Sequence, residues 1–440
     1  MMKKNDIYEG TCSDYTYDGL GIVKVDGFSV FVKNVIIGET ILFKLIKIKK
    51  NYGYGRIIEI KNPSIHRTTP FCEYFGKCGG CQLQHMDLEA QNELKENIVI
   101  NNIRRIAHSD AEVKPILNGQ PRAYRNKAQF PLTANPYALG FYRIHSNEIV
   151  DITMCPIQSD KINTLYQYLR LHLKSTSFVS KLRHILIKHA FHTDEIMLVF
   201  IASDNIQNSM EEFINKLTKE QNITSVILNV NRSTNNVILG NEEHLLFGSN
   251  TINESLMGYT FQIASKSFYQ VNPEQTKVLY EKVLEYANIT KNDTVIDLYC
   301  GVGSISLFLA KSAKQVIGIE IVEDAITNAK ANAKMNHINN IEFVCSDAGT
   351  YAEYMVANNI TANIVVLDPP RKGCDDKTIQ SVIKMHPERI VYVSCNPATL
   401  ARDIEKFEQF DYKCTIVQPV DMFPHTFHVE TVCLMSRKEK

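Results

Sequence analysis

The stretch from Thr294 to Ser306 reads TVIDLYCGVGSIS, an apolar run followed by a glycine-bearing loop and the start of a helical pattern. A short run rich in apolar and β-branched residues predicts a buried strand. Gly301 and Gly303 allow the backbone to turn tightly and to come close to a ligand. A strand, a glycine loop and a helix in this order indicate a cofactor site at the carboxyl end of the strand.

Apolar runs alternate with helical segments around this stretch. The runs are QVIGIE, IEFVCSD, NIVVLDPP and RIVYVSC, and helical patterns such as EDAITNAKANAKMNH separate them. Alternation of this kind predicts a parallel sheet with helices on both faces. We therefore expect a Rossmann-like α/β domain over residues 256–440.

Acidic residues at the predicted strand ends indicate which cofactor the loop binds. Glu320 ends the second strand, where it can bind ribose hydroxyls, and Asp347 follows the third. A dinucleotide enzyme would share the loop and Glu320, but Ser304 and Ser306 stand where a third glycine is expected. A carboxylate at Asp297 would repel a pyrophosphate, whereas it suits a cationic sulfonium and its amino group. The pattern favours S-adenosylmethionine over NAD.

Three further residues supply reactive side chains near predicted strand ends. Asp368 begins the turn of LDPPRKG, Cys395 ends RIVYVSC, and Glu430 stands in the apolar run HVETVCLM. A thiolate that adds to a pyrimidine ring makes the neighbouring carbon nucleophilic enough to accept a methyl group. A carboxylate can then remove the ring proton so that the thiolate is expelled. These residue types predict Cys395 as the nucleophile and Glu430 as the base.

Four of the 11 cysteines stand in the expected middle domain, residues 61–255. Cys72, Cys78 and Cys81 lie in CEYFGKCGGCQLQ, and Cys155 lies in TMCPIQ. An odd number of cysteines without an export signal disfavours a disulfide framework. Four thiolates suit zinc and an iron–sulfur cluster equally well, so the residues alone leave both open.

Residues 1–60 carry the signals of a small β-barrel. Asp26 and Gly27 form a hairpin signal between alternating apolar runs. The following strand alternates apolar residues with lysines, and tyrosines come next: Lys44, Lys47, Lys49, Tyr52 and Tyr54. A basic face beside aromatic rings is typical of a nucleic-acid platform. Lysines that protect an edge strand explain the same residues equally well.

The composition fits a folded protein with more than one domain, since the chain has 440 residues, of which 44% are hydrophobic and 22% are charged. The formal net charge is zero, so nucleic-acid binding must depend on local basic patches. The amino end shows no signal peptide, and the longest apolar run, IMLVFIA, is too short to cross a bilayer. We expect a soluble, cytoplasmic protein without membrane association or an obligate protein partner.

Five motifs together resemble the RNA uridine-5 methyltransferases that use S-adenosylmethionine: FYQVNPEQ, DLYCGVG, LDPPRKG, VSCNPATLARD and HVETV. The resemblance covers nearly the whole chain, and SCNPATLARD is highly specific. It implies a class I methyltransferase domain in which Cys395 is the nucleophile and Glu430 is the proton-abstracting base. The cofactor contacts that it implies are Gln270, Tyr299, Glu320, Asp347 and Asp368.

The resemblance is to the ribosomal-RNA members of that family. Their amino-terminal module is the OB-like TRAM barrel, which binds RNA, and the predicted barrel is similar to it. The cysteine spacing is similar to that of members with a 4Fe–4S cluster, which implies that Cys72, Cys78, Cys81 and Cys155 hold such a cluster. The cluster would hold a region of irregular structure together, because methyl transfer involves no electron transfer. The implied substrate is a uridine of 23S ribosomal RNA.

Three alternatives stay open. The same reaction could act on a tRNA uridine, which the TRAM module does not exclude. A radical methylthiotransferase also combines a cluster, S-adenosylmethionine and a TRAM module, but its three-cysteine motif has a shorter first gap and no fourth cysteine. A non-catalytic RNA-binding assembly factor would not need a nucleophile, a base and a cofactor loop.

Overall fold

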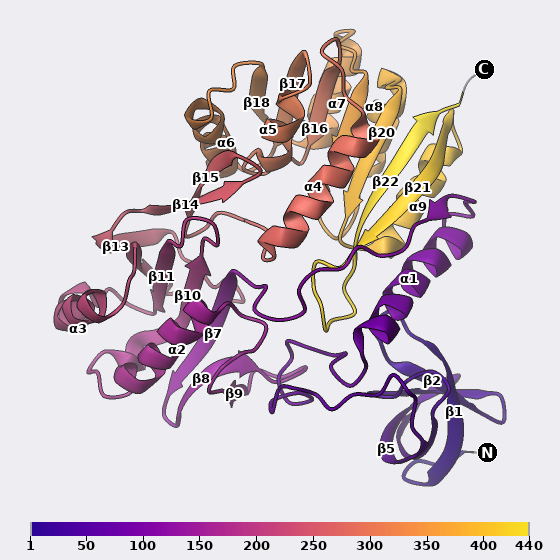
Figure 1. The fold of residues 1–440 in the computed structure, drawn as a ribbon, viewed down its shortest axis with the longest axis vertical. Helices are drawn as coiled ribbons and strands as arrows, with labels where there is room; N and C mark the ends of the chain where they lie inside the picture. Colours follow the sequence, from indigo (N-terminus) through magenta and orange to yellow (C-terminus); the bar gives the residue numbers. More distant parts are fainter. Residues whose placement is uncertain (1, 439–440) are drawn as a thin grey trace.

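The computed structural model describes residues 2–438 of the chain. Figure 1 shows a small barrel at the amino end, a central sheet with its helices, and a larger α/β body that contains the carboxyl end. The barrel and the central sheet both lie below the α/β body in this view. None of the described helices is both long enough and apolar enough to span a lipid bilayer.

The amino-terminal barrel closes in the strand order β1-β2-β3-β5-β4. Its strands are β1 (Ile7–Tyr15), β2 (Gly21–Val25), β3 (Phe28–Val32), β4 (Thr40–Ile48) and β5 (Tyr52–Asn62). Asp26 and Gly27 adopt φ values of 49° and 80°, as a two-residue hairpin turn between β2 and β3 requires. Buried residues such as Ile41 and Phe43 fill the interior. The predicted barrel is confirmed, and its last strand extends to Asn62.

The central sheet has the order β13-β12-β11-β10-β7-β8-β9 among the described residues. Its strands are β7 (Lys127–Ala134), β8 (Tyr137–Tyr142), β9 (Ile149–Asp151), β10 (Leu182–His189), β11 (Ile196–Ala202), β12 (Ser225–Val230) and β13 (Glu242–Gly248). The helices α2 (Asp160–Leu173) and α3 (Gln207–Glu220) pack on it, and a short 3₁₀ helix, η1 (Val179–Lys181), precedes β10. The longest apolar run of the sequence forms β11, which is wholly buried inside this sheet.

The α/β body is built on a sheet with the order β18-β17-β16-β19-β20-β22-β21-β6. Its strands are β6 (Glu112–Val113), β16 (Thr294–Leu298), β17 (Gln315–Glu320), β18 (Ile341–Cys345), β19 (Ile364–Leu367), β20 (Arg389–Ser394), β21 (Tyr412–Val420) and β22 (Glu430–Arg437). Strands β16 to β20 run parallel, as the sequence predicts. Strand β22 runs antiparallel between β20 and β21.

Helices cover both faces of this sheet, which also agrees with the prediction. The helices α4 (Pro273–Ala287), α5 (Ser304–Ala310) and α6 (Glu323–Met335) pack on one face. The other face carries α1 (Leu88–Arg105), α7 (Ala348–Ala357), α8 (Asp376–Met385) and α9 (Pro397–Glu408). The strands end between these two helical layers, which is where such folds bind ligands.

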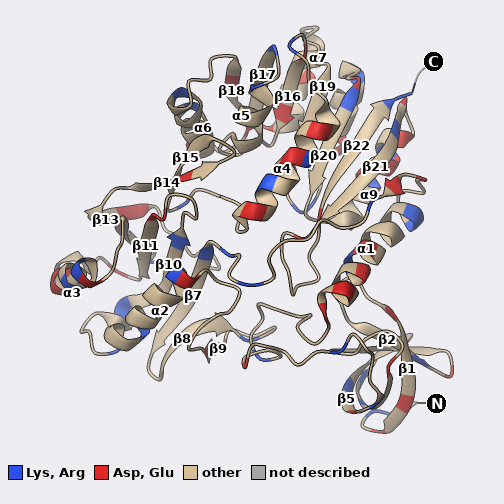
Figure 2. Cartoon of the chain, viewed as in Figure 1, with Lys and Arg blue, Asp and Glu red and all other residues tan. Residues whose placement is uncertain are grey.

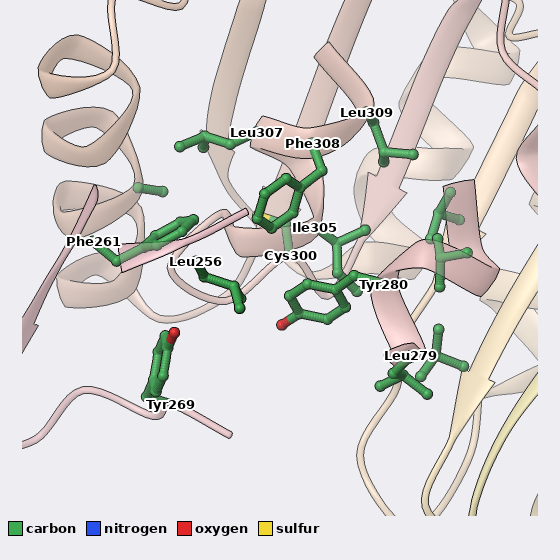
Figure 3. Close-up of a cluster of buried hydrophobic side chains, with 14 of the residues drawn as sticks. Leu256, Phe261, Tyr269, Leu279, Tyr280, Cys300, Ile305, Leu307, Phe308 and Leu309 are labelled. Carbon is green, nitrogen blue, oxygen red and sulfur yellow. The ribbon is translucent and has the colours of Figure 1, made fainter. Parts of the chain in front are cut away.

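Segments from outside the expected range 256–440 complete the α/β body. The hairpin of β14 (Thr251–Leu256) and β15 (Tyr259–Ala264) places Phe261 with its ring centre 5.9 Å from that of Phe308 in α5 (Figure 3). Helix α1 packs against α9, and β6 pairs in parallel with β21. The expected boundary between residues 255 and 256 therefore falls inside one hairpin, and residues 88–117 lie with the α/β body.

Candidate active site

Four residues singled out from the sequence converge at one edge of the α/β sheet. Asp297 lies near the carboxyl end of β16, Asp368 directly follows β19, and Cys395 directly follows β20. Glu430 is the first residue of β22, and because β22 runs antiparallel to β20, its start lies at the same edge. The sheet thus collects one thiol and three carboxylates from four different strands.

The thiol of Cys395 lies beside the carboxylate of Glu430. Burial raises the pKa of Cys395 to about 11, and the charges of Glu430 and Asp368 add to the rise. A thiol with such a pKa is protonated at neutral pH, so it must lose its proton as it attacks. Cys395 therefore needs a nearby positive charge to act as a nucleophile.

Glu430 is a buried acid, with 5% of its surface exposed. Burial raises its pKa to about 8, the charge of Asp368 adds to the rise, and the guanidinium of Arg371 opposes it. A carboxylate whose pKa lies near neutral is suited to take up a proton during a reaction. The environment of Glu430 therefore places the pKa of its carboxyl where it can exchange a proton near neutral pH.

Arg371 is a cation close to this edge, and no sequence pattern predicts a role for it. Its charge opposes the rise that burial causes in the pKa of Cys395 and of Glu430. Its carbonyl accepts hydrogen bonds from Nδ2 of Asn396 at 3.1 Å and from Oγ1 of Thr399 at 3.2 Å. Both donors belong to the segment that follows Cys395, so the two loops are tied together. The only signal in the sequence was its position directly after the prolines of LDPPRKG.

Carboxylates gather at the strand ends where the cofactor is expected. Asp297 is fully buried; one of its oxygens accepts a hydrogen bond from the Ser306 hydroxyl, and Oδ1 has no partner among residues 2–438. Burial raises the pKa of Asp297 and that of Asp368 to about 7. Glu320 contributes a third negative charge near Asp297. An unpartnered buried carboxylate oxygen among acids fits a cationic ligand, such as the sulfonium and ammonium groups of S-adenosylmethionine.

The glycine loop has the conformation that its residues predict. Gly303 has a φ of 79°, and a Cβ added to it would lie 2.7 Å from Cζ of Phe343, so this position must stay glycine. Gly301 has a φ of 55°, and no described atom lies within 4 Å of a Cβ added there, which leaves space for a ligand. The amide of Gly301 donates a hydrogen bond at 3.2 Å to the carboxylate of Glu320.

Other predicted cofactor contacts also have structural partners. The hydroxyl of Tyr299 lies 3.3 Å from Oγ1 of Thr378, on the side of α8. Asp347 caps α7, where Oδ1 accepts the amide of Thr350 at 2.9 Å, and this bond lowers the pKa of Asp347. The side chain of Gln270 is half-buried. These hydrogen bonds engage the Tyr299 hydroxyl and Oδ1 of Asp347. The Tyr299 ring, Oδ2 of Asp347 and the Gln270 side chain are the groups left for a ligand.

The predicted cluster cysteines line one cavity of about 260 Å³, which they share with Arg125 and Lys127. The four are Cys72, Cys78, Cys81 and Cys155, and all are free thiols. Within the described part of the chain, no group of three or more His, Cys, Asp or Glu side chains is arranged as a metal site. The cysteines therefore surround a common space without being arranged around one ion. Four thiols around one space are a donor set of the kind that zinc and iron–sulfur clusters both use.

Comparison with known proteins agrees with this geometry. The model of the tRNA (uracil-5-)-methyltransferase family matches residues 88–438. An RNA methyltransferase of Bacillus cereus is 44% identical, with 100% of this chain and 98% of that protein covered. An RNA methyltransferase of Staphylococcus aureus is 41% identical, with 99% of each chain covered.

A solved structure is similar over almost the whole chain. It is the Pyrococcus abyssi tRNA (uracil-54, C5)-methyltransferase in complex with S-adenosyl-L-homocysteine, with a TM-score of 0.76 and 26% sequence identity. The similarity covers 97% of this chain and 99% of that chain, so it includes the barrel as well as the α/β body. The chain belongs to the S-adenosylmethionine-dependent RNA uracil-5 methyltransferase family.

Proposed function

We propose that the chain methylates carbon 5 of a uridine in 23S ribosomal RNA through a covalent bond between Cys395 and carbon 6 of the ring. The observation that best supports this route is the position of Cys395 beside Glu430, next to the acidic cofactor crevice. A nucleophile and a base with a pKa near neutral are the two groups that the covalent route requires.

The steps follow from the residues at the sheet edge. The sulfur of Cys395 adds to carbon 6 while its proton leaves to water, and the ring becomes an enolate. When bound, S-adenosylmethionine supplies the methyl group that carbon 5 accepts. Glu430 then removes the proton from carbon 5, and the bond between carbon 6 and sulfur breaks. The products are 5-methyluridine, S-adenosyl-L-homocysteine, a protonated Glu430 and the Cys395 thiolate.

Arg371 provides the positive charge that the first step needs. Its guanidinium opposes the rise in the pKa of Cys395 that burial causes, so it favours the thiolate. The same charge stabilises the carboxylate form of Glu430, the form that accepts a proton. We assign the cofactor contacts to Gln270, Tyr299, Glu320, Asp347 and Asp368.

The barrel is the proposed RNA-binding module. Phe31, Tyr52 and Tyr54 form an aromatic cluster with ring centres 5.2 to 5.8 Å apart, and Nζ of Lys47 lies 5.8 Å from the centre of the Tyr54 ring. Aromatic rings beside a cation are suited to stacking on unpaired bases. Figure 2 shows further basic positions near β5 and on β7 and β10. Cys395 is half-buried, so the target uridine must leave its stack to reach it.

A tRNA uridine is the second candidate substrate. The Pyrococcus abyssi neighbour is a tRNA (uracil-54, C5)-methyltransferase and aligns over 97% of this chain, so the barrel by itself does not separate the two substrates. Mass mapping of 5-methyluridine in total RNA, from cells with and without this protein, decides between them. Loss of the modification from 23S ribosomal RNA is the expected result. Loss from tRNA alone would select the second candidate.

We propose that Cys72, Cys78, Cys81 and Cys155 hold a 4Fe–4S cluster. Their common cavity and their free thiols support this, and the adjoining Arg125 and Lys127 would offset its negative charge. Bound there, the cluster would join the segment 72–81 to the loop between β9 and α2 that contains Cys155. Binding would draw the four thiols together from the positions that they now occupy around the cavity.

A further inference from the structure

The loop that precedes Glu430 is held by residues from outside its own strands. This β21–β22 loop comprises residues 421–429, and Figure 1 shows it in yellow, projecting from the sheet towards the purple amino-terminal half of the chain. A loop without regular structure depends on such contacts to keep one conformation. Strand pairing holds the Glu430 backbone opposite Val420. The loop contacts constrain the segment that leads directly into it, and with it the direction of the Glu430 side chain.

A buried ion pair fixes the start of the β21–β22 loop. The ammonium of Lys95, in α1, lies 2.5 Å from Oδ1 of Asp421 and donates a second hydrogen bond at 3.2 Å to the Phe423 carbonyl. The side chains of Lys95 and Asp421 are only 0% and 3% exposed. A buried ion pair gives little net stability but specifies one arrangement of the groups around it. Here it specifies the position of the loop relative to α1.

The segment that follows the cluster cysteines fixes the middle of the loop. The carbonyl of His425 accepts hydrogen bonds from the amides of Gln82 and Leu83, at 2.9 and 3.0 Å, directly after Cys81. The amide of His425 donates a hydrogen bond at 2.9 Å to the side chain of Gln91 in α1. His425 has a φ of 67°, a conformation that a non-glycine residue keeps only where its surroundings hold it.

Two further hydrogen bonds complete the support. The buried hydroxyl of Tyr124 donates to the Pro424 carbonyl at 3.1 Å. The side-chain amide of Asn272, which caps α4, donates to the Met422 carbonyl at 3.2 Å. Each residue from 421 to 425 is thus hydrogen-bonded to a segment outside β21 and β22. By contrast, Cys395 directly follows β20 and lies outside this loop in the chain.

We infer that Lys95, Tyr124 and His425 are positioning residues for Glu430, and that they control the final proton abstraction rather than methyl transfer. This inference rests on the proposed role of Glu430 as the base. Methyl transfer requires Cys395 and the proposed cofactor contacts Tyr299, Glu320, Asp347 and Asp368, which lie at or just after the ends of sheet strands. Proton abstraction requires in addition that the Glu430 carboxylate points at carbon 5, and the β21–β22 loop helps to set that direction. Loosening the loop should therefore slow one step and spare the other.

The test separates the two steps in the full-length protein. The enzyme is mixed with labelled S-adenosylmethionine and total RNA from cells that lack this protein. The first measurement is the rate at which label enters RNA, and the second is the labelled RNA–protein adduct that survives denaturing electrophoresis. Tyr124→Phe removes one hydrogen bond to the loop, and Lys95→Met removes the ion pair. Tyr412→Phe is the matched control, because its buried hydroxyl donates at 2.8 Å to the carbonyl of Pro387, away from the loop.

We expect both loop variants to accumulate the labelled adduct while the first methyl transfer changes by less than about twofold. Resolution of the adduct should slow by about fivefold in Tyr124→Phe, as the loss of one hydrogen bond predicts. It should slow by on the order of a hundredfold in Lys95→Met. Tyr412→Phe should resolve the adduct at the wild-type rate. Because Tyr124→Phe keeps the shape of the side chain, it tests the inference even if Lys95→Met does not fold.

Two results would overturn the inference. One is normal resolution of the adduct in Tyr124→Phe, and the other is an equal slowing of methyl transfer and resolution. A Glu430→Gln sample run in parallel distinguishes the causes of failure. If Glu430→Gln accumulates the adduct and the loop variants do not, only the positioning role is wrong. If Glu430→Gln accumulates none, the proposed base itself is wrong.

Discussion

Ser394 pairs with Thr431 across the antiparallel strands β20 and β22, and the Thr431 hydroxyl donates a hydrogen bond at 3.1 Å to the Ser394 carbonyl. Each of these residues adjoins one member of the proposed catalytic pair, Cys395 and Glu430. The strand pairing therefore fixes the backbone positions of the two residues relative to each other before any substrate binds, while the direction of the Glu430 side chain also depends on the loop that precedes it. Preorganisation of this kind avoids the free-energy cost of arranging the groups during the reaction.

Substitution of the two proposed catalytic residues should stop the reaction at different points. Cys395→Ala should form no adduct and transfer no methyl group, because the ring is never activated. Glu430→Gln keeps the shape but removes the base, so a methylated RNA–protein adduct should accumulate. Denaturing electrophoresis with labelled methyl donor measures both outcomes.

The double variant is the control for this experiment and should give no adduct. Normal turnover by Glu430→Gln would make Glu430 structural, and Asp368 would become the first candidate for the base. Formation of 5-methyluridine by Cys395→Ala would contradict the covalent route.

The stability of the cofactor-free protein should depend on pH through Glu430. Burial raises the pKa of this acid from 4.5 to about 8, so the folded protein holds the proton more tightly than the unfolded chain. The resulting contribution to stability is complete below the unfolded value and is lost as the pH rises to about 8. As the pH rises, the free energy of unfolding of the wild type should therefore fall relative to that of Glu430→Gln, by on the order of a few kcal/mol. Urea unfolding at several pH values measures this difference. A difference that stays constant with pH would contradict the raised pKa.

Removal of the Arg371 charge should make Cys395 less reactive. Without the guanidinium, burial and the nearby acids act unopposed, so the pKa of the thiol should rise further in Arg371→Gln. A rise of one unit slows alkylation of the thiol near neutral pH by about tenfold. Mass spectrometry of the Cys395 peptide after timed iodoacetamide treatment measures this rate. Lys372→Gln, one residue later, is the control and should react like the wild type.

The aromatic cluster of the barrel should contribute to RNA affinity without affecting the cofactor. Replacement of Tyr52 and Tyr54 by Ser removes two stacking surfaces and should weaken RNA binding by about 1 to 3 kcal/mol for each base that stacks there. Affinity for S-adenosylmethionine should stay unchanged, because the proposed cofactor contacts lie in the α/β body. Filter binding with total RNA and calorimetry with the cofactor measure the two quantities. Unaltered RNA affinity would remove the barrel from the recognition surface.

The proposed cluster should colour the protein. We expect protein purified without oxygen to be brown, with broad visible absorption, and to lose the colour when Cys78 is replaced by Ser. Cys414→Ser is a control, because this buried thiol lies in the α/β body, away from the cysteine cavity. Stoichiometric zinc without iron in the anaerobic sample would refute the cluster.

The sequence predicts most of the residues at the sheet edge for a simple reason. Parallel strands end at one edge, so a polar residue directly after each apolar run, such as Asp368 or Cys395, must lie near the others. The order in which the strands pair is less visible. Periodicity places Glu430 in a strand, but only the antiparallel entry of β22 beside β20 brings it to the same edge.

Contacts between distant segments could not be predicted from local patterns. Lys95 and Asp421 stand 326 residues apart, and each alone is typical of an exposed, solvated residue. Arg371 is basic next to a turn, which indicates nothing until the structure brings it beside Cys395. The domain limits failed to anticipate α1 and β6 for the same reason, since helix and strand signals do not reveal their partners.

The short parallel strand β6 has a consequence for how this chain can be divided. Glu112 and Val113 pair with Ile416 and Val417, and so cover the outer edge of β21. A fragment that starts at residue 256 would leave that edge uncovered, with unpaired amide and carbonyl groups that invite aggregation. Residues 256–440 therefore do not form an independent folding unit. Recombination or expression that divides the chain between residues 255 and 256 would separate the sheet of the α/β body from β6, which covers part of its edge.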